Sequence, residues 1–174
     1  MPATLPDVNR IIAGVAGFLD DLAERARGYT PEEVAVARAC FNALLSGAPA
    51  LIPDVLSGLD IDVEAGGRVL AALEGKGVLA ISAGAITVAR GLSRPPTDHR
   101  LHVREGPALY ACCAVDAVGI PAALGADARV TSRCHACRAP ITISITGGQL
   151  ARVAPDVVIW AADADPGRSL REYT

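Results

Sequence analysis

The residues best suited to chemistry are four cysteines and one acid in the second half of the chain. Cys112 and Cys113 are adjacent, Asp116 follows Cys113 by three positions, and Cys134 and Cys137 form a CxxC pair. Thiolates are nucleophiles and ligands of soft metals, and a nearby carboxyl group can transfer a proton. The cluster therefore predicts a soft-metal site or a thiolate reaction.

The spacing of Cys113 and Asp116 suits a shared pocket. Residues 108–118 have apolar positions at helical intervals, so we expect a helix there. Helix residues three positions apart lie on one face, whereas Cys112 would be turned away by about 100°. We therefore favour Cys113 over Cys112, and expect its sulfur and the Asp116 carboxyl group to lie within about 7 Å, because direct proton transfer needs hydrogen-bond reach.

The CxxC pair suggests a different site. Two cysteines at this spacing supply half of a tetrahedral zinc or iron site. The other half could come from Cys112 and Cys113 or from a histidine nitrogen, and we expect about one zinc per chain at such a site. The alternative is that Cys134 and Cys137 are reduced, packed and without metal. The histidines considered as ligands are His102 and His135.

Several of these residues also have simpler interpretations. Asp116 could be a carboxylate on a helix surface, His99 and His102 are interpreted as solvated linker residues, and Cys40 as a small buried hydrophobe on a helix. The two arginines beside the CxxC pair would lower its thiol pKa values if their guanidinium groups lay close. These are Arg133 and Arg138.

Composition excludes some classes of protein. The 174 residues are 51% hydrophobic but only 3% aromatic, so small aliphatic side chains must fill the core. A net charge of −3 does not indicate a nucleic-acid-binding protein. No apolar run approaches the length of a membrane span, and no leader pattern is evident, so we expect a cytoplasmic protein with reduced thiols.

The chain divides at the prolines near residue 95, which gives expected domains of 1–92 and 93–174. In the first, helices are expected at residues 9–26, from 31, at 50–56 and at 63–76, followed by two short strands up to about residue 92. This order predicts a winged-helix-like module. Its last helix offers few basic groups, mainly Arg68 and Lys76, so DNA binding is weakly supported.

The second domain is expected to be a small mixed β-sheet with the Cys113 helix packed on it. Strands are expected at residues 100–103, 128–131, 141–146 and 157–161. The whole chain is thus predicted to be an α+β protein.

The stretch from Leu109 to Ile145 resembles the core signature of the alkylmercury (organomercurial) lyases. It contains LYACCAVDAVGIPAALGADARVTSRC followed by APITISI, and the resemblance covers this stretch almost without gaps. The resemblance implies cleavage of carbon–mercury bonds without a required cofactor, acting on a small organomercurial. It implies that Cys113 binds mercury, that Asp116 protonates the departing carbon, and that Cys134 supports the fold.

One feature departs from that family. A second essential family cysteine lies well downstream of the core, and no cysteine follows Cys137 in this sequence. Its substitute could be Cys112, Cys134 or Cys137, so the bound metal, zinc or mercury, is assigned to these and Cys113. The alternative function is a thiol-based metal or mercury sensor without turnover. The sequence does not indicate an oligomeric state.

Overall fold

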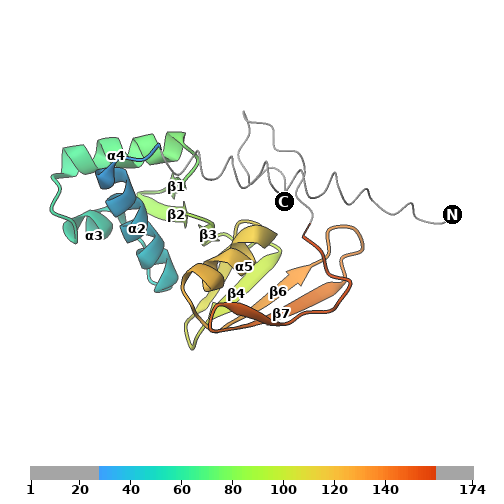
Figure 1. The fold of residues 1–174 in the computed structure, drawn as a ribbon. Coiled ribbons are helices and arrows are strands. Elements are labelled where there is room, and N and C mark those ends of the chain that lie inside the picture. The colour runs from blue at the N-terminus through green and yellow to red at the C-terminus, as the bar shows by residue number, and fades with distance from the viewer. Residues whose placement is uncertain (1–27, 160–174) are drawn as a thin grey trace. The chain divides into compact units, whose positions relative to one another are not determined.

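The computed structural model describes residues 28–159, which contain three helices before the first strand and a fourth between two strands of one sheet (Figure 1). The helices are α2 (Pro31–Leu45), α3 (Ile52–Ser57), α4 (Val63–Gly75) and α5 (Ala114–Ala123). The strands are β1 (Leu79–Ser82), β2 (Ala85–Ala89), β3 (Leu92–Ser93), β4 (His99–Val103), β5 (Ala108–Ala111), β6 (Ala128–Arg133), β7 (Pro140–Thr146) and β8 (Gln149–Arg152). The α+β class is confirmed.

Local sequence signals explain the first helices. α4 begins where the Asp62 carboxylate accepts hydrogen bonds from the backbone N–H groups of Glu64 and Ala65, at 2.9 and 3.0 Å. α2 begins at Pro31, whose missing N–H is harmless in a first turn. These helices and α3 confirm the predictions within a few residues. The helix predicted at residues 9–26 lies outside the described residues.

The strands form one sheet in the order β1-β2-β3-β5-β4-β6-β7-β8, and every described pairing is antiparallel. The prediction of a mixed sheet is therefore wrong for this part of the chain. α5 connects β5 to β6, which run in the same direction, but β4 lies between them and pairs with both. The helical connection thus places no parallel strands next to each other.

The sheet continues across the expected domain boundary. β3 begins at Leu92 and pairs with β2 on one side and β5 on the other, and both of its residues are buried. Residues 31–159 accordingly form one compact unit. The two predicted regions share this sheet, and their division and the winged-helix assignment of the first remain predictions.

Two other expectations were wrong. Residues 108–118 are not one helix, because β5 occupies 108–111 as an inner strand and α5 begins at Ala114. A short apolar run does not by itself distinguish a helix from a buried strand. Residues 157–159 form no strand, and the rest of the strand predicted at 157–161 lies outside the described residues. β8 was not predicted; all of its residues are exposed, so it has no alternating apolar pattern.

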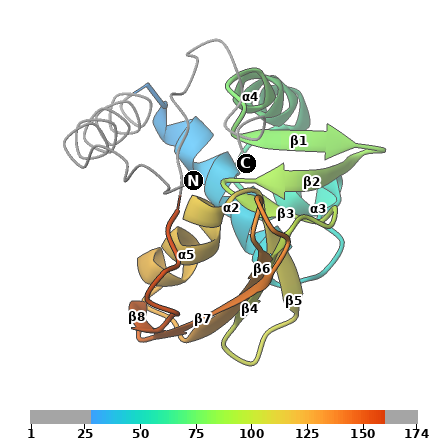
Figure 2. The same ribbon diagram turned by 90° about the vertical axis from the view of Figure 1, so that its right-hand side faces the viewer.

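α5 packs against β4, β5, β6 and β7, on one face of the sheet (Figure 2). Its buried residues, among them Ala117 and Ile120, meet a core that includes Leu101 of β4 and Val130 of β6, both without solvent exposure. This packing fixes the beginning of α5, where the cysteines and the acid of interest lie.

Candidate active site

Cys113 and Asp116 meet at the first turn of α5. Cys113 is the N-cap residue, with φ −147° and ψ 171°, and its Sγ accepts a hydrogen bond from the Asp116 backbone N–H at 3.3 Å. The same thiol donates to Asp116 Oδ2 at 3.0 Å. The expected approach within about 7 Å is thus confirmed, although the two side chains meet through a helix cap rather than along one helix face.

The surroundings of Cys113 keep its thiol protonated. Burial, which acts most strongly, the negative charge of Asp116 and the hydrogen bond to its carboxylate together raise the pKa of Cys113 to about 12. Backbone N–H groups at the helix N-terminus oppose this shift but are outweighed. The resting state at neutral pH is therefore a thiol that donates to a carboxylate.

A glycine allows the carboxyl group to occupy this position. Gly91 has a φ of +87°, and its carbonyl accepts a hydrogen bond from the Cys112 N–H at 2.7 Å. A Cβ atom built on Gly91 would lie 2.5 Å from the carboxyl carbon of Asp116. Sequence reasoning did not single out Gly91, because its position between Arg90 and Leu92 resembles an ordinary turn glycine.

His99 belongs to the neighbourhood of the acid. It lies on β4, is partly buried, and its Nδ1 is 3.0 Å from the Ser132 Oγ. Burial lowers the pKa of His99, while the charges of Asp98 and Asp116 act in the opposite direction. The interpretation of His99 and His102 as solvated linker residues was wrong, because both are part of an inner strand.

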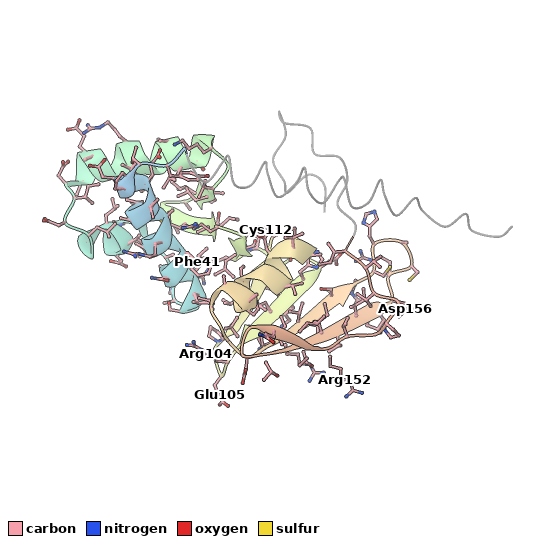
Figure 3. The ribbon with its side chains drawn as sticks, viewed as in Figure 1. Phe41, Arg104, Glu105, Cys112, Arg152 and Asp156 are labelled. Atoms are coloured by element: carbon pink, nitrogen blue, oxygen red, sulfur yellow. The ribbon has the colours of Figure 1, made fainter. Side chains whose placement is uncertain are left out.

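A cavity of about 310 Å³ adjoins Asp116, but Cys113 is not among its lining residues, so the expectation of a pocket shared by both side chains is not confirmed. α5 supplies apolar and small residues to its wall, α2 supplies Phe41 and Arg38, and the turn between β2 and β3 supplies Arg90. Figure 3 shows Phe41 on α2, near α5. The remaining lining residues are Val115, Asp116, Gly119, Ile120 and Ala123 of α5 and Leu124, the C-cap residue that follows this helix.

The CxxC pair lies on the turn between β6 and β7. The backbone N–H of Cys134 donates to the Ala139 carbonyl, and that of Arg138 to the Cys134 carbonyl, at 2.8 and 2.9 Å. The pKa of Cys134 is lowered, first by the backbone N–H groups of Cys137 and Ala136 and then by the Cys137 side chain. The nearby Arg138 contributes least, and its guanidinium group is bound to Asp98.

The larger metal site is not confirmed. Among residues 28–159 no three His, Cys, Asp or Glu side chains form a group that could hold a metal ion. Cys112 and Cys113 therefore do not complete a tetrahedral site with the CxxC pair here. A site made by Cys134 and Cys137 with ligands from elsewhere remains a prediction.

Comparisons with known proteins relate the second half of the chain to one family. Residues 92–174 match the family model described as alkylmercury lyase. The alkylmercury lyase of Streptomyces lividans is 38% identical over 82 residues, covering 47% of this chain and 38% of that protein. That of Pseudomonas putida is 39% identical over 79 residues, covering 44% and 37%. The chain thus matches well under half the length of these curated relatives.

A solved structure extends the likeness. The mercury-bound form of MerB2 has a TM-score of 0.72 and 25% sequence identity, covering 86% of this chain and 76% of that chain. The comparisons confirm that the second half of the chain resembles the alkylmercury lyase family. No helix among the described residues is long and apolar enough to cross a membrane.

Proposed function

We propose that this protein cleaves carbon–mercury bonds by protonolysis, with Cys113 as the mercury ligand and Asp116 as the proton donor. The observation that carries the proposal is the 3.0 Å hydrogen bond from the Cys113 thiol to the Asp116 carboxylate. It lies within the part of the chain that matches the alkylmercury lyases.

The hydrogen bond supplies a route for the proton. When R–Hg⁺ binds Cys113 Sγ, the thiol proton leaves the sulfur, and the Asp116 carboxylate is already in place to accept it. The protonated Asp116 then delivers this proton to the mercury-bound carbon. The carbon–mercury bond breaks, and its electron pair forms the new carbon–hydrogen bond. The products are R–H and Hg(II) bound to sulfur, so atoms and charge balance.

A second sulfur donor is needed for efficient cleavage. One thiolate alone gives a stable R–Hg–S species, and another soft ligand raises electron density on mercury and carbon. We propose Cys134 or Cys137 for this role, because they lie on a turn and the pKa of Cys134 is already lowered. Cys112 remains the alternative, since it precedes α5 instead of lying on its far side.

Single-turnover assays that follow hydrocarbon release test these roles. Cys113→Ala should abolish capture of the mercurial and its cleavage, whereas Asp116→Ala should retain capture but lose cleavage. The double variant Cys134→Ser, Cys137→Ser should retain capture and lose turnover. Full hydrocarbon release from the double variant would exclude the CxxC pair. No release from the unmodified protein would favour the alternative function, a thiol-based mercury-binding sensor.

The remaining parts of the proposal concern the first half of the chain and the location. We propose a winged-helix-like arrangement for α2, α3, α4, β1 and β2, supported by their order. DNA binding by α4 is disfavoured, because Arg68 and Lys76 are both paired with glutamates.

A cytoplasmic location is supported by the absence of a disulfide among the five cysteines, all of which lie in the described range. Zinc-supplemented expression followed by metal analysis tests for zinc at the CxxC pair.

A further inference from the structure

We propose that the cavity beside Asp116 holds the organic group of the substrate and that Arg38 and Arg90 select organic groups carrying a carboxylate. The preferred substrate class would be arylmercurials with an anionic substituent on the ring. This inference rests on the proposed function, because it assigns the part of the substrate that the mercury-binding sulfur does not hold.

The position of Asp116 decides where the organic group lies. Proton transfer requires the accepting carbon to be within hydrogen-bond reach of the carboxyl group. Asp116 lines the cavity, so a group attached to that carbon extends into the space between α2 and α5. The position of Asp116 in the fold therefore fixes how far the organic group of the substrate lies from the acid.

The walls of the cavity suit an aromatic ring. Its apolar lining comes from Phe41 on α2, from Val115 and Ile120 on α5, and from Leu124 at the C-cap of α5. The volume of about 310 Å³ lies at the lower end of the range for small-molecule sites. A cavity of about 150 Å³ can hold benzene, so a substituted ring fits here. A free inorganic anion has no apolar surface to bury against these side chains, so the lining favours an organic anion.

Two guanidinium groups give the cavity a positive charge. Arg38 comes from α2 and Arg90 from the turn after β2, and the only other ionisable residue in the described lining is Asp116. Within residues 28–159 neither arginine side chain forms an ion pair or hydrogen bond. By contrast, Arg68, Arg94 and Arg138 are held by protein oxygen atoms.

An arginine without a protein partner is well suited to bind a carboxylate. Its planar guanidinium group can donate two parallel hydrogen bonds to the two carboxylate oxygens. The Arg90 backbone is fixed by a hydrogen bond from its N–H to the Val78 carbonyl at 2.9 Å and by a φ of +46°. The turn therefore places this arginine in the lining of the cavity, to which Arg38 contributes from α2.

The test compares 4-carboxyphenylmercury with phenylmercury. Two rates are measured for each compound: capture by Cys113, followed by mass spectrometry, and hydrocarbon release in a single turnover. We expect the unmodified protein to favour the carboxylated compound about tenfold, a preference of the size that one charge-assisted hydrogen bond gives. Arg38→Gln and Arg90→Gln should each reduce this preference, the ratio of the rate with 4-carboxyphenylmercury to the rate with phenylmercury, severalfold. Added salt should also reduce it.

Arg129→Gln is the matched control. Arg129 is exposed on β6, outside the cavity lining, so its loss should leave the ratio unchanged. Cleavage of phenylmercury with no preference for the carboxylated compound would overturn this inference and leave the proposed function intact. An equal loss of preference in Arg129→Gln would overturn it as well, because it would indicate a general charge effect. If neither compound is cleaved, the proposed function fails, and the ratio of capture rates still decides whether the arginines select the carboxylate.

Discussion

The carboxylate of Asp116 accepts a hydrogen bond from the Cys113 thiol and helps to keep that thiol protonated. The acid raises the pKa of the thiol, and the thiol holds the proton that the acid needs for the reaction. Cys113 is therefore not an activated thiolate at rest, as a mercury ligand could be expected to be. Its activation depends on the arrival of a metal that displaces the proton.

The first prediction concerns Asp116→Asn. This change removes the negative charge and the carboxylate acceptor, both of which raise the Cys113 pKa, so that pKa should fall from about 12. It should stay above the ordinary value of 9.0, because burial is the largest cause of the shift. The pH dependence of thiolate ultraviolet absorbance, measured as the difference from Cys113→Ala, reports this pKa. An unchanged or higher pKa would contradict the assigned cause.

The second prediction concerns Gly91→Ala. The added Cβ would collide with the Asp116 carboxyl group, and alanine is strained at a φ of +87°. We expect hydrocarbon release to fall at least tenfold while mercurial capture by Cys113 continues, because the acid and not the sulfur is displaced. Gly84→Ala is the control, since Gly84 has a φ of +73° but open space around it. Equal losses in the two variants would indicate backbone strain alone.

At the scale of single residues, the sequence predicted that Cys113 and Asp116 meet, but not which other residues surround them. The spacing of Cys113 and Asp116 was sufficient to predict that the two meet, because a helix cap and a helix face both bring such residues together. The positions of Gly91 at the acid and of Arg38 and Arg90 at the cavity were not predictable, since the turn after β2 and helix α2 are both distant from Asp116 in the sequence. Such long-range contacts leave no mark in local periodicity.

At the scale of the elements, an ion pair joins α2 to α4, and the glutamate of this pair is largely buried. Lys76 Nζ lies 2.7 Å from both carboxylate oxygens of Glu33, whose side chain is only 8% exposed. Lys76 is the C-cap residue of α4, and Glu33 lies in the first turn of α2. The pair thus fixes the ends of two helices to each other.

The third prediction uses this pair. Lys76→Met removes the cation and leaves the buried Glu33 carboxylate without it, which should lower the free energy of unfolding by about 1–3 kcal/mol in a urea titration. Arg68→Met is the control, because the Arg68–Glu64 pair is exposed, at 66% and 86%, and should cost less than about 0.5 kcal/mol. Similar losses in both would show that burial of Glu33 does not matter.

The elements with capping residues were predicted best. Thr30-Pro31 marks the start of α2 in the sequence, and α4 begins at Val63 as expected, after Asp62 as its N-cap. The beginning of α5 was misplaced because a cysteine serves as its N-cap. Cysteine is not one of the usual capping residues, and the preceding Leu109 and Tyr110 have the apolar character of either a strand or a helix. Residues 108–111 form a strand because they pair with β3 and β4.

At the scale of residues 31–159, the continuous sheet makes the two predicted regions depend on each other. Leu92 is 1% exposed and lies on the short strand that joins β2 to β5. The sequence predicted most strands on each side but not their connection, because a strand of two residues is too short to show a period. The prolines that follow it suggested a linker where the sheet continues.

The fourth prediction follows from this continuity. Native-state hydrogen exchange should give the amides of β2 and β6 the same free energy of global opening, because the two strands belong to one sheet. Leu92→Ala should lower both values together, by about 2–5 kcal/mol. A decrease in β2 with no change in β6 would show that the two regions unfold independently.

The burial of Cys40 has a consequence for the proposed reaction, whose product is Hg(II). Cys40 is 0% exposed and burial raises its pKa to about 11, whereas an unfolded chain presents all five thiols. A ligand that binds the unfolded chain more tightly than the folded one shifts the equilibrium towards unfolding by mass action. Hg(II) formed in the proposed reaction would gain Cys40 as an additional thiol ligand only in the unfolded chain, so this product would favour unfolding. The stability of the α2 packing around Cys40 therefore sets how much mercury the protein tolerates before it is trapped unfolded.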